Sequence, residues 1–428
     1  MINFTVPVPV RKLVDRFKDM ADPHQWAQLA SMFVYFLTGT GSLCDFVRKN
    51  PWSPSVSSLS RFIQEFDGNR ALRRMRGRVL RRYVKKYGSL NPNNFVFAVD
   101  DTNNPKFGKS YRAGSWYSSK GICHGQRIVV LALVDIVNDV AIPLSFRIAT
   151  KTDHPDYQPC YDFVLEQLNE VKNEGFATLT VVFDSWFDSS EFIADVAAFG
   201  FEVTWEAKAS RTVKTSISPW SHWKKIGKTF TKVKRFRARN RMEAAAVKRR
   251  EKRAPCVAQL RLFFKKLERR VNCIACYSRR NGKNAFAYWA STDLMLTATQ
   301  IWEMGRARWR IEKLFRELKQ HLSFGRLPSG SREATELSIC LPFIVYVSLQ
   351  LEPELWGKQE DVTTGDIIRS IRIEAMHKSI TMAVEKSHSD PLLIRFRART
   401  CKNRVNKKPV NQTAEYRGKK KILEEKAS

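Results

Sequence analysis

The segment Asn94–Asp101 reads NFVFAVDD, a hydrophobic run that ends in two acidic residues. Its aromatic and β-branched residues predict a buried β-strand. A second run of this kind, TLTVVFD at Thr178–Asp184, also ends in an acid. Ligands of α/β proteins bind beyond the carboxyl ends of the strands, and divalent cations prefer oxygen ligands. Asp100, Asp101 and Asp184 are therefore candidates for one site at the edge of a sheet, although a single Asp at a strand end is more often a turn residue.

Strand-like and helix-like segments alternate around these two runs. The apolar spacing predicts further strands over 127–137, 140–148 and 201–207, and helices over 157–173 and 189–199. A chain that alternates in this way buries its strands in one layer and packs its helices against them. The predicted fold class is a mixed α/β sheet.

Changes in composition divide the chain into six predicted regions. They are a helical, helix-turn-helix-like region over 1–90, the first part of the α/β core over 91–208, a basic β-rich insertion over 209–285, the last core strand and a long helix over 286–325, a helical region over 326–394, and a basic tail over 395–428. In the first region, two short helices suit DNA reading, and plain helix packing gives the same pattern. The run of arginines that follows them, over 73–82, adds to the case for phosphate binding.

The charge balance indicates the class of partner. The 428 residues include 74 Lys and Arg against 42 Asp and Glu, a formal net charge of +32. Such an excess requires a polyanion, of which nucleic acid is the default and an anionic membrane surface the rival. The most apolar windows, Ala27–Leu37 and Leu337–Leu351, are shorter than the roughly 18 residues of a spanning helix and predict core helices. With no secretory signal expected and 8 irregularly spaced cysteines, we predict a cytoplasmic protein that acts away from the membrane.

The helix predicted over 298–322 carries a further acidic candidate. Arg308, Glu312 and Lys319 are spaced i, i+4 and i+11, so they share one face beside the apolar stripe of the helix. An acid between two bases suits a metal ligand with phosphate-binding neighbours, and it also suits an ordinary Arg308–Glu312 salt bridge. Carboxylates gathered in one pocket repel one another unless cations neutralise them, and two Mg2+ ions about 3.5–4 Å apart are the usual solution for phosphodiester chemistry. We expect two Mg2+ ions, which Mn2+ can replace.

The ordered set of motifs resembles the DDE transposases of bacterial insertion sequences. The set consists of Asp-x-Thr at 100–102, VVFD at 181–184 and RWRIEKLFRELK at 308–319. The group with a β insertion between the second Asp and the Glu is the most similar, because the basic insertion fills the interval between Asp184 and Glu312. The sequence Ser-Thr-Asp-Leu at 291–294, just before the long helix, also looks like that group.

The resemblance implies an RNase H-like core in which three acids hold the metal ions. The second and third acids are Asp184 and Glu312. The first acid is either Asp100 or Asp101. The Asp-x-Thr spacing favours Asp100, whereas other members of the family align better with Asp101.

The helix pattern of the family is Tyr-x2-Arg-x3-Glu-x6-Lys. The three charged residues of the predicted helix match its last three positions, but the Tyr position is Gly305. In the family that Tyr helps to hold a terminal phosphate. Trp302 or Trp309 is a candidate to replace it here.

The resemblance also gives the basic insertion a role. Some members form a hairpin on the element end and hold a flipped base against a Trp of the insertion, for which Trp220 and Trp223 are candidates. Core packing is the alternative for both indoles. We expect Lys234, Arg235 and Arg237 in the same insertion to bind DNA phosphates.

The implied activity is cut-and-paste transposition. The protein would bind the inverted repeats of its element as double-stranded DNA, cleave at their ends and join the freed 3′-OH to target DNA, as a homodimer in a synaptic complex associated with the bacterial nucleoid. One rival is an inactive, DNA-binding descendant that acts as a repressor, against which the presence of all three acids argues. The other is a nuclease of the same fold that does not join strands.

Overall fold

The computed structural model describes residues 6–39, 41–50, 53–106, 110–118, 121–208, 210–214, 221–222, 256–280, 283–327, 330–357 and 362–387. The chain divides into two compact units, Met1–Arg369 and Ser370–Ser428. The first unit contains the sheet and all the acidic candidates. The last helix, α12 (Thr364–Ser387), begins in the first unit and ends in the second.

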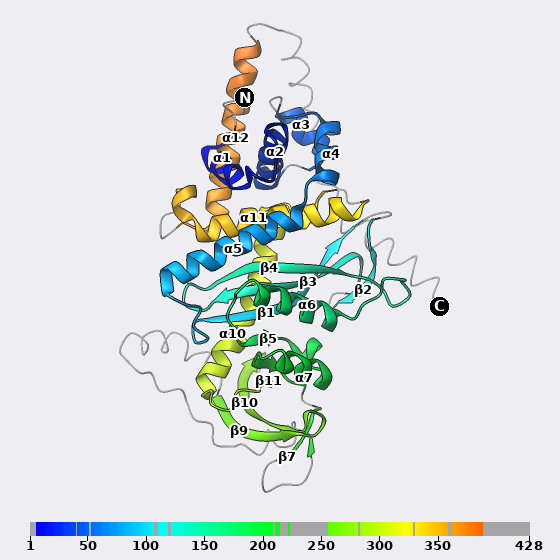
Figure 1. The fold of residues 1–428 in the computed structure, drawn as a ribbon, viewed down its shortest axis with the longest axis vertical. Helices are drawn as coiled ribbons and strands as arrows, with labels where there is room; N and C mark the ends of the chain where they lie inside the picture. Colours follow the sequence, from blue (N-terminus) through cyan, green and yellow to red (C-terminus); the bar gives the residue numbers. More distant parts are fainter. Residues whose placement is uncertain are drawn as a thin grey trace. The chain divides into compact units, whose positions relative to one another are not determined.

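A mixed sheet forms the centre of the first unit (Figure 1). Its strands in the described residues are β1 (Phe95–Pro105), β2 (Gly114–Ser118), β3 (Gly121–Asp135), β4 (Val140–Ala149), β5 (Val181–Phe183), β6 (Val203–Glu206), β7 (Thr212–Lys214), β8 (Ser221–His222), β9 (Cys256–Phe264), β10 (Arg269–Arg280) and β11 (Lys283–Ser291). They lie in the order β2-β3-β1-β5-β6-β11-β10-β9-β7-β8, and β4 pairs with β3. The β1–β5 and β5–β6 pairs are parallel, and the other pairs are antiparallel. The predicted mixed α/β fold class is confirmed.

The remaining helices precede, interrupt and follow this sheet. They are α1 (Val8–Val14), α2 (Pro23–Thr38), α3 (Leu43–Lys49), α4 (Val56–Glu65), α5 (Gly68–Tyr87), α6 (Cys160–Asn173), α7 (Ser190–Ala198), α10 (Ala298–His321) and α11 (Arg332–Leu351), with the short 3-10 turns η1 (Asp15–Phe17), η2 (Ser185–Phe187), η3 (Lys265–Leu267) and η4 (Pro353–Trp356). Many of them start at a side-chain cap, which satisfies N–H groups that the first turn leaves open. The capping residues with this contact are Asp22, Ser42, Ser55, Asp67, Thr297 and Ser331.

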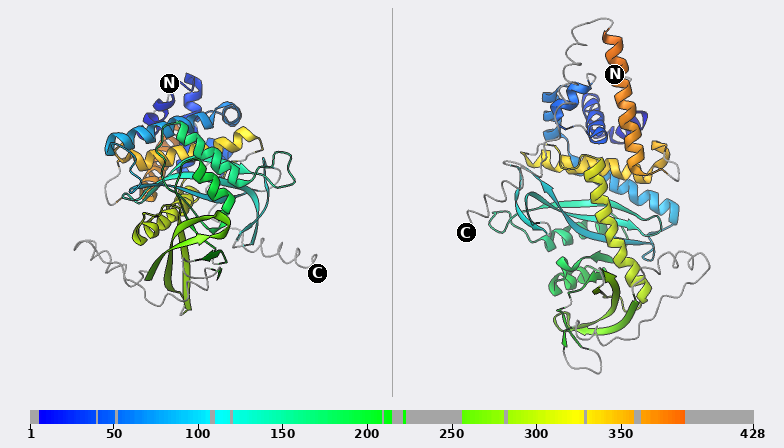
Figure 2. Two further views of the ribbon diagram at one scale, coloured as in Figure 1. Left: turned by 60° about the horizontal axis from the view of Figure 1, so that its bottom comes forward. Right: turned by 180° about the vertical axis from the view of Figure 1, so that it is seen from behind.

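Helices cover both faces of the sheet. Helix α6 packs on β3 and β4 on one face, whereas α10 crosses the other face and contacts β1, β5, β6 and β11 (Figure 2). Helix α10 begins with a capping box between Thr297 and Gln300. The apolar stripe that the sequence predicts for it is buried against the sheet, with Met304, Ala307, Ile311, Phe315, Leu318 and Leu322 all 7% exposed or less. This burial fixes where the charged face of α10 meets the strand ends.

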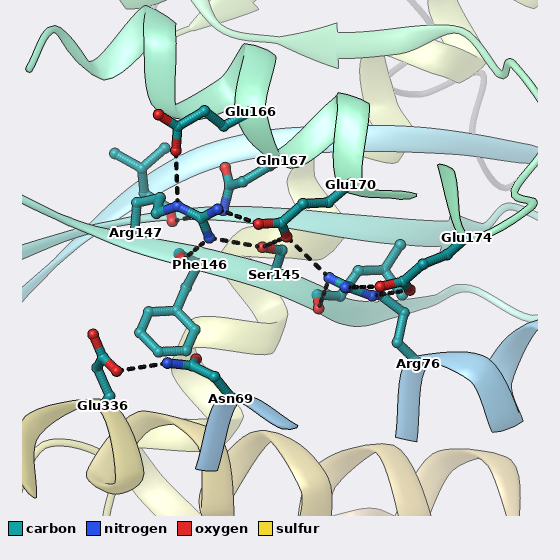
Figure 3. Close-up of polar contacts among 12 residues, drawn as sticks. Asn69, Arg76, Ser145, Phe146, Arg147, Glu166, Gln167, Glu170, Glu174 and Glu336 are labelled. Carbon is teal, nitrogen blue, oxygen red and sulfur yellow. Dashed lines mark hydrogen bonds and ion pairs between the residues drawn. The ribbon is translucent and has the colours of Figure 1, made fainter. Parts of the chain in front are cut away.

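Helices α5 and α11 pack against each other beside β4. By length and apolarity α11 could cross a membrane, but 83% of its apolar window is buried inside the protein. Nδ2 of Asn69 on α5 donates a hydrogen bond of 2.5 Å to Oε2 of Glu336 on α11 (Figure 3). The expectation that Leu337–Leu351 forms a core helix agrees with this packing.

Most arginines in the run on α5 form ion pairs within the protein, which the sequence did not predict. Four of the six arginines form ion pairs with acids elsewhere in the chain, and the phosphate-binding role of the run stays a prediction. The pairs are Arg74–Asp19, Arg76–Glu174, Arg78–Glu352 and Arg82–Glu354. Arg73 and Arg81 are exposed and stay available to a phosphate.

Arg76 is the most buried member of the run, at 4% exposure. It pairs with Glu174 and Glu170 at α6 and donates a hydrogen bond of 3.3 Å to the carbonyl of Leu144 on β4 (Figure 3). Glu170 also pairs with Arg147. Burial raises the pKa of Glu170, but the hydrogen bond and charge of Arg147 and the charge of Arg76 outweigh it, so the pKa lies below its ordinary value. This network joins α5 to α6 across the edge of the sheet.

Replacing Arg76 by Met should therefore destabilise the protein by about 2 kcal/mol, less than for a fully buried pair because both acids keep some contact with water. Chemical denaturation measures the loss, and the exposed Arg73→Met on the same helix is the control. Glu170 adds a pH dependence. Its stabilisation is fully present above pH 4.5, the ordinary carboxyl pKa, and disappears as the pH falls through the lower folded pKa. Equal stability of the two Met variants would show that the network contributes nothing.

Candidate active site

Asp100 and Asp184 lie beside each other on neighbouring parallel strands. β1 pairs with β5 so that Ala98 is opposite Val182, and Asp100 and Asp184 each follow this pair by two residues. The backbone of Asp184 is still extended, with φ −85° and ψ 179°. Residues in register on parallel strands point to the same face of a sheet. The sequence-predicted pair therefore meets beneath α10.

Asp100 is held under α10 with its side chain 13% exposed. One carboxylate oxygen accepts a hydrogen bond of 3.3 Å from Nη1 of Arg308, and the other accepts one of 2.8 Å from the N–H of Asp101. Burial raises the pKa of Asp100 to about 7. The charge of Arg308 opposes this rise, whereas the charges of Asp184 and Asp101 add to it. The pocket thus holds more negative charge than Arg308 balances.

Asp101 points to the opposite face of β1, because successive side chains of a strand alternate. There Arg127 of β3 grips it with a fork: Nε donates to Oδ2 at 2.9 Å and Nη2 donates to Oδ1 at 2.8 Å. The guanidinium of Arg127 also stacks on Trp186, 4.1 Å from the ring centre. A carboxylate engaged by both oxygens in this way has its charge compensated within the protein.

Asp184 follows β5 directly and caps the short turn η2. Its Oδ1 accepts a hydrogen bond of 2.9 Å from the N–H of Trp186, which fixes the side chain. Burial raises the pKa of Asp184, although the N–H of Trp186 and the charge of Arg308 act in the other direction. Asp184 is therefore a second carboxylate whose ionised form requires positive charge nearby.

Arg308 links the strand acids to the helix acid. Its Nη1 pairs with Asp100 at 3.3 Å and its Nη2 pairs with Glu312 at 2.9 Å. The side chain of Arg308 is 8% exposed and that of Glu312 is 48% exposed. The salt bridge that the sequence offered as the ordinary alternative is present, but Arg308 also reaches Asp100 on the sheet. One guanidinium thus lies between carboxylates from two elements.

The oxygen donors of this pocket are those that hard divalent cations prefer. Burial raises the pKa of Asp100, and the charges of Asp184 and Asp101 raise it further, so a cation there would favour the ionised form. Among the residues that the structure describes, no group of three or more His, Cys, Asp or Glu side chains is arranged to hold a metal ion. The guanidinium between Asp100 and Glu312 accounts for this arrangement.

Lys319, the second expected phosphate-binding residue, contacts β1. Its Nζ donates to Oγ1 of Thr102 at 2.6 Å and to the carbonyl of Asn103 at 2.8 Å. Thr102 is only 6% exposed. Lys319 therefore fastens the last turns of α10 to the end of β1, next to the acids.

Gly305, which stands at the family's Tyr position, has a steric explanation in Trp289 of β11. A Cβ atom at residue 305 would lie 2.7–2.8 Å from three atoms of the Trp289 indole. Trp289 is 7% exposed, so its ring has little freedom to move away. The space beside α10 is thus filled from the sheet by Trp289. The replacement of the family's Tyr by Trp302 or Trp309 at a terminal phosphate stays a prediction, and Trp309 is 56% exposed.

Sequence reasoning missed two residues near the acids, Arg127 and Glu206. Glu206 ends β6, and its electrostatic neighbours include Arg308 and Asp184. The rule that selected Asp100, an acid at the end of a hydrophobic strand, could have found Glu206 as well. No comparable signal marks Arg127. The predicted DNA-binding residues Trp220, Trp223, Lys234, Arg235 and Arg237 lie outside the described residues.

The contact at Gly305 makes a measurable prediction. Gly305→Ala should destabilise the protein by about 1–3 kcal/mol, because the added methyl group overpacks a buried indole. Gly77→Ala on α5 is the matched control, since its Cβ would meet only Arg81 Nη1, at 3.5 Å; it should be neutral or stabilising by up to about 1 kcal/mol. Thermal and urea denaturation compare the two. A Gly305→Ala protein as stable as the Gly77→Ala protein would contradict the steric explanation.

Comparison with known proteins agrees with the resemblance seen in the sequence. The chain matches the model of a family described as "Transposase DDE domain" over residues 94–348, more than half its length. No curated protein matches it. A cryo-EM structure of a piggyBac transposase synaptic complex with hairpin DNA is similar at a TM-score of 0.45 and 10% sequence identity, over 91% of this chain and 80% of that one. The acids at 100 and 184 and the helix that bears Glu312 all lie within the matched residues, and the chain belongs to the family of transposases with a DDE domain.

Proposed function

We propose that this transposase cuts DNA at the inverted-repeat ends of its element and joins the freed 3′-OH to target DNA, with Asp100, Asp184 and Glu312 as the metal ligands. Family membership supplies the reaction class, DNA transposition by a DDE domain. One observation carries the choice of residues: the register of β1 and β5 aligns Asp100 with Asp184 beneath α10, the helix that bears Glu312. Transposases of this family use divalent metals; we propose two Mg2+ ions, replaceable by Mn2+.

The contacts of the two adjacent acids favour Asp100 over Asp101 as the first ligand. Both oxygens of Asp101 are engaged by Arg127 on the other face of the strand. Asp100 shares its face with Asp184 and is bound by Arg308, whose other pair is Glu312. An acid that must bind a cation together with the other two has to be on their face of the sheet.

Each residue of the pocket has a defined task in this proposal. Bound divalent cations ease deprotonation of the attacking water or 3′-hydroxyl and stabilise the leaving oxygen. The N–H of Trp186 fixes the side chain of Asp184, and Lys319 fastens α10 to the end of β1. These contacts hold the acids in place before DNA arrives, which reduces the cost of assembling the site on the substrate.

Arg308 is the proposed phosphate-binding residue. Its guanidinium pairs with both Asp100 and Glu312. The fork also matches the geometry of the phosphate next to the scissile bond, which it would bind when these acids hold cations. Lys319 adds a point charge further along the same helix.

The partners follow from charge and family. We propose double-stranded DNA as partner, both as element ends and as target, bound by a homodimer in the synaptic complex within the bacterial nucleoid. The net charge of +32 supports extensive phosphate contact. The helical region 1–90 and the basic insertion 209–285 are the proposed contacts with the element end.

Asp184→Asn and Glu312→Gln should each slow cleavage of an element end by more than about 100-fold, the upper limit for losing a residue that merely supports a ligand. Binding of the end should persist, because neither change removes positive charge. Single-turnover cleavage with Mg2+, and with EDTA as the metal-free reference, measures the first effect, and gel shift measures the second. Asp195→Asn, an exposed acid on α7, is the control. Full cleavage by either variant would refute the assignment, and cleavage without joining by the unmodified protein would indicate a nuclease.

Arg308→Ala should slow single-turnover cleavage more than it weakens end binding, because the fork is expected to orient and stabilise the reacting phosphate. Arg308→Lys should recover part of the rate, since an ammonium cannot reproduce two parallel hydrogen bonds. Arg316→Ala, an exposed arginine of the same helix, controls for lost positive charge. Melting temperatures measured on the same samples separate unfolding from slow chemistry. Normal cleavage by folded Arg308→Ala would reduce Arg308 to a structural salt bridge.

A further inference from the structure

Glu206 extends the row of acids on the sheet to a third parallel strand. β6 pairs with β5 so that Trp205 is opposite Phe183, and Glu206 and Asp184 each follow this pair by one residue. Asp100 and Asp184 likewise follow a pair of β1 and β5 by two residues. Asp100 on β1, Asp184 directly after β5 and Glu206 at the end of β6 therefore follow the paired residues of three adjacent strands by one or two positions.

The side chain of Glu206 faces the same helix as the other acids. Thr204, two residues earlier on β6, donates a hydrogen bond of 3.9 Å from Oγ1 to the sulfur of Met304 on α10. Residues i and i+2 of a strand share a face. Glu206 therefore points toward α10, where Arg308 and Glu312 lie.

The backbone that carries Glu206 is firmly placed. Glu206 pairs with Trp289 across the β6–β11 ladder, and the indole of Trp289 lies against Gly305 of α10. One contact thus sets both the strand end and its distance from the helix, which keeps the position of Glu206 fixed relative to Glu312.

In the part of the chain that the structure describes, no contact explains why an acid is present at this position. Among the described residues, no hydrogen bond or ion pair is formed by the carboxylate of half-buried Glu206. Burial raises its pKa; the charge of Arg308 lowers it, and Asp184 and Glu312 raise it further. Arg308 contributes one positive charge to a pocket with four acids. An acid is retained in such surroundings at a cost in stability, unless something else binds it.

We propose that Glu206 is a fourth carboxylate of the divalent-cation site, binding the cation on the side of Asp184. The inference rests on the proposed function of that site and extends it by one residue. It also accounts for the gathering of four acids around Arg308, since hard cations are bound by several carboxylate oxygens.

The test measures cation binding directly, without relying on activity. Mn2+ is titrated into the full-length protein bound to an element end, and free Mn2+ is read by electron paramagnetic resonance. Glu206→Gln, which keeps the size of the side chain and removes its charge, should weaken Mn2+ binding about tenfold or more. Glu191→Gln, an exposed acid on α7, should leave the affinity unchanged. In single-turnover cleavage, the Mg2+ concentration for half-maximal rate should rise for Glu206→Gln alone.

The outcomes distinguish a failure of this inference about Glu206 from a failure of the proposed metal site on which it rests. If Mn2+ binding depends on Asp184 but is unchanged in Glu206→Gln, Glu206 is not a ligand, whereas the site itself stands. If Asp184→Asn binds Mn2+ as tightly as the unmodified protein, the proposed site fails. Melting temperatures in EDTA verify folding, and Glu206→Asp serves as a second variant. Its shorter carboxylate should also weaken Mn2+ binding, and unchanged affinity there would count against the inference.

Discussion

The guanidinium of Arg308 lies between carboxylates that belong to different elements, Asp100 on β1 and Glu312 on α10. Without it, Asp100 and Asp184 would face Glu312 of α10 with no positive charge between them, and their repulsion would oppose the packing of α10 on the sheet. With it, the helix can bury its apolar stripe and still carry an acid to the strand ends. The packing of α10 on the sheet favours an apolar interface, whereas the site brings Glu312 next to the strand acids. The charge of Arg308 makes both possible.

The parallel pairing of β1 with β5 and of β5 with β6 determines where Asp100, Asp184 and Glu206 lie. Register on adjacent parallel strands is set by hydrophobic residues such as Val182 and Val203, which are fully buried. A slip of one residue would move every acid to the other face and expose that core. The precision of the acidic row is thus maintained by apolar packing several ångströms away from it.

Local patterns in the sequence were sufficient for much of this fold. The runs that end at Asp101 and Asp184 form strands, and the helix bearing Glu312 has the predicted apolar stripe. These features were predictable because the spacing of hydrophobic residues along a short segment indicates its secondary structure. The partners of these acids were not predictable in this way. Arg127 is 26 positions from Asp101 and Arg308 is 208 positions from Asp100, and only the folded topology brings them together. The ion-pair partners of the arginine run on α5 were not predictable for the same reason, since they lie elsewhere in the chain.

The contact between Gly305 and Trp289 has a consequence for the family's history. The indole of Trp289 on β11 fills the space beside α10 at Gly305. Two bulky side chains cannot occupy that volume together, so the residues at these two positions are expected to change together during divergence. Relatives with a large side chain at the position of Gly305 should therefore carry a small one at the position of Trp289.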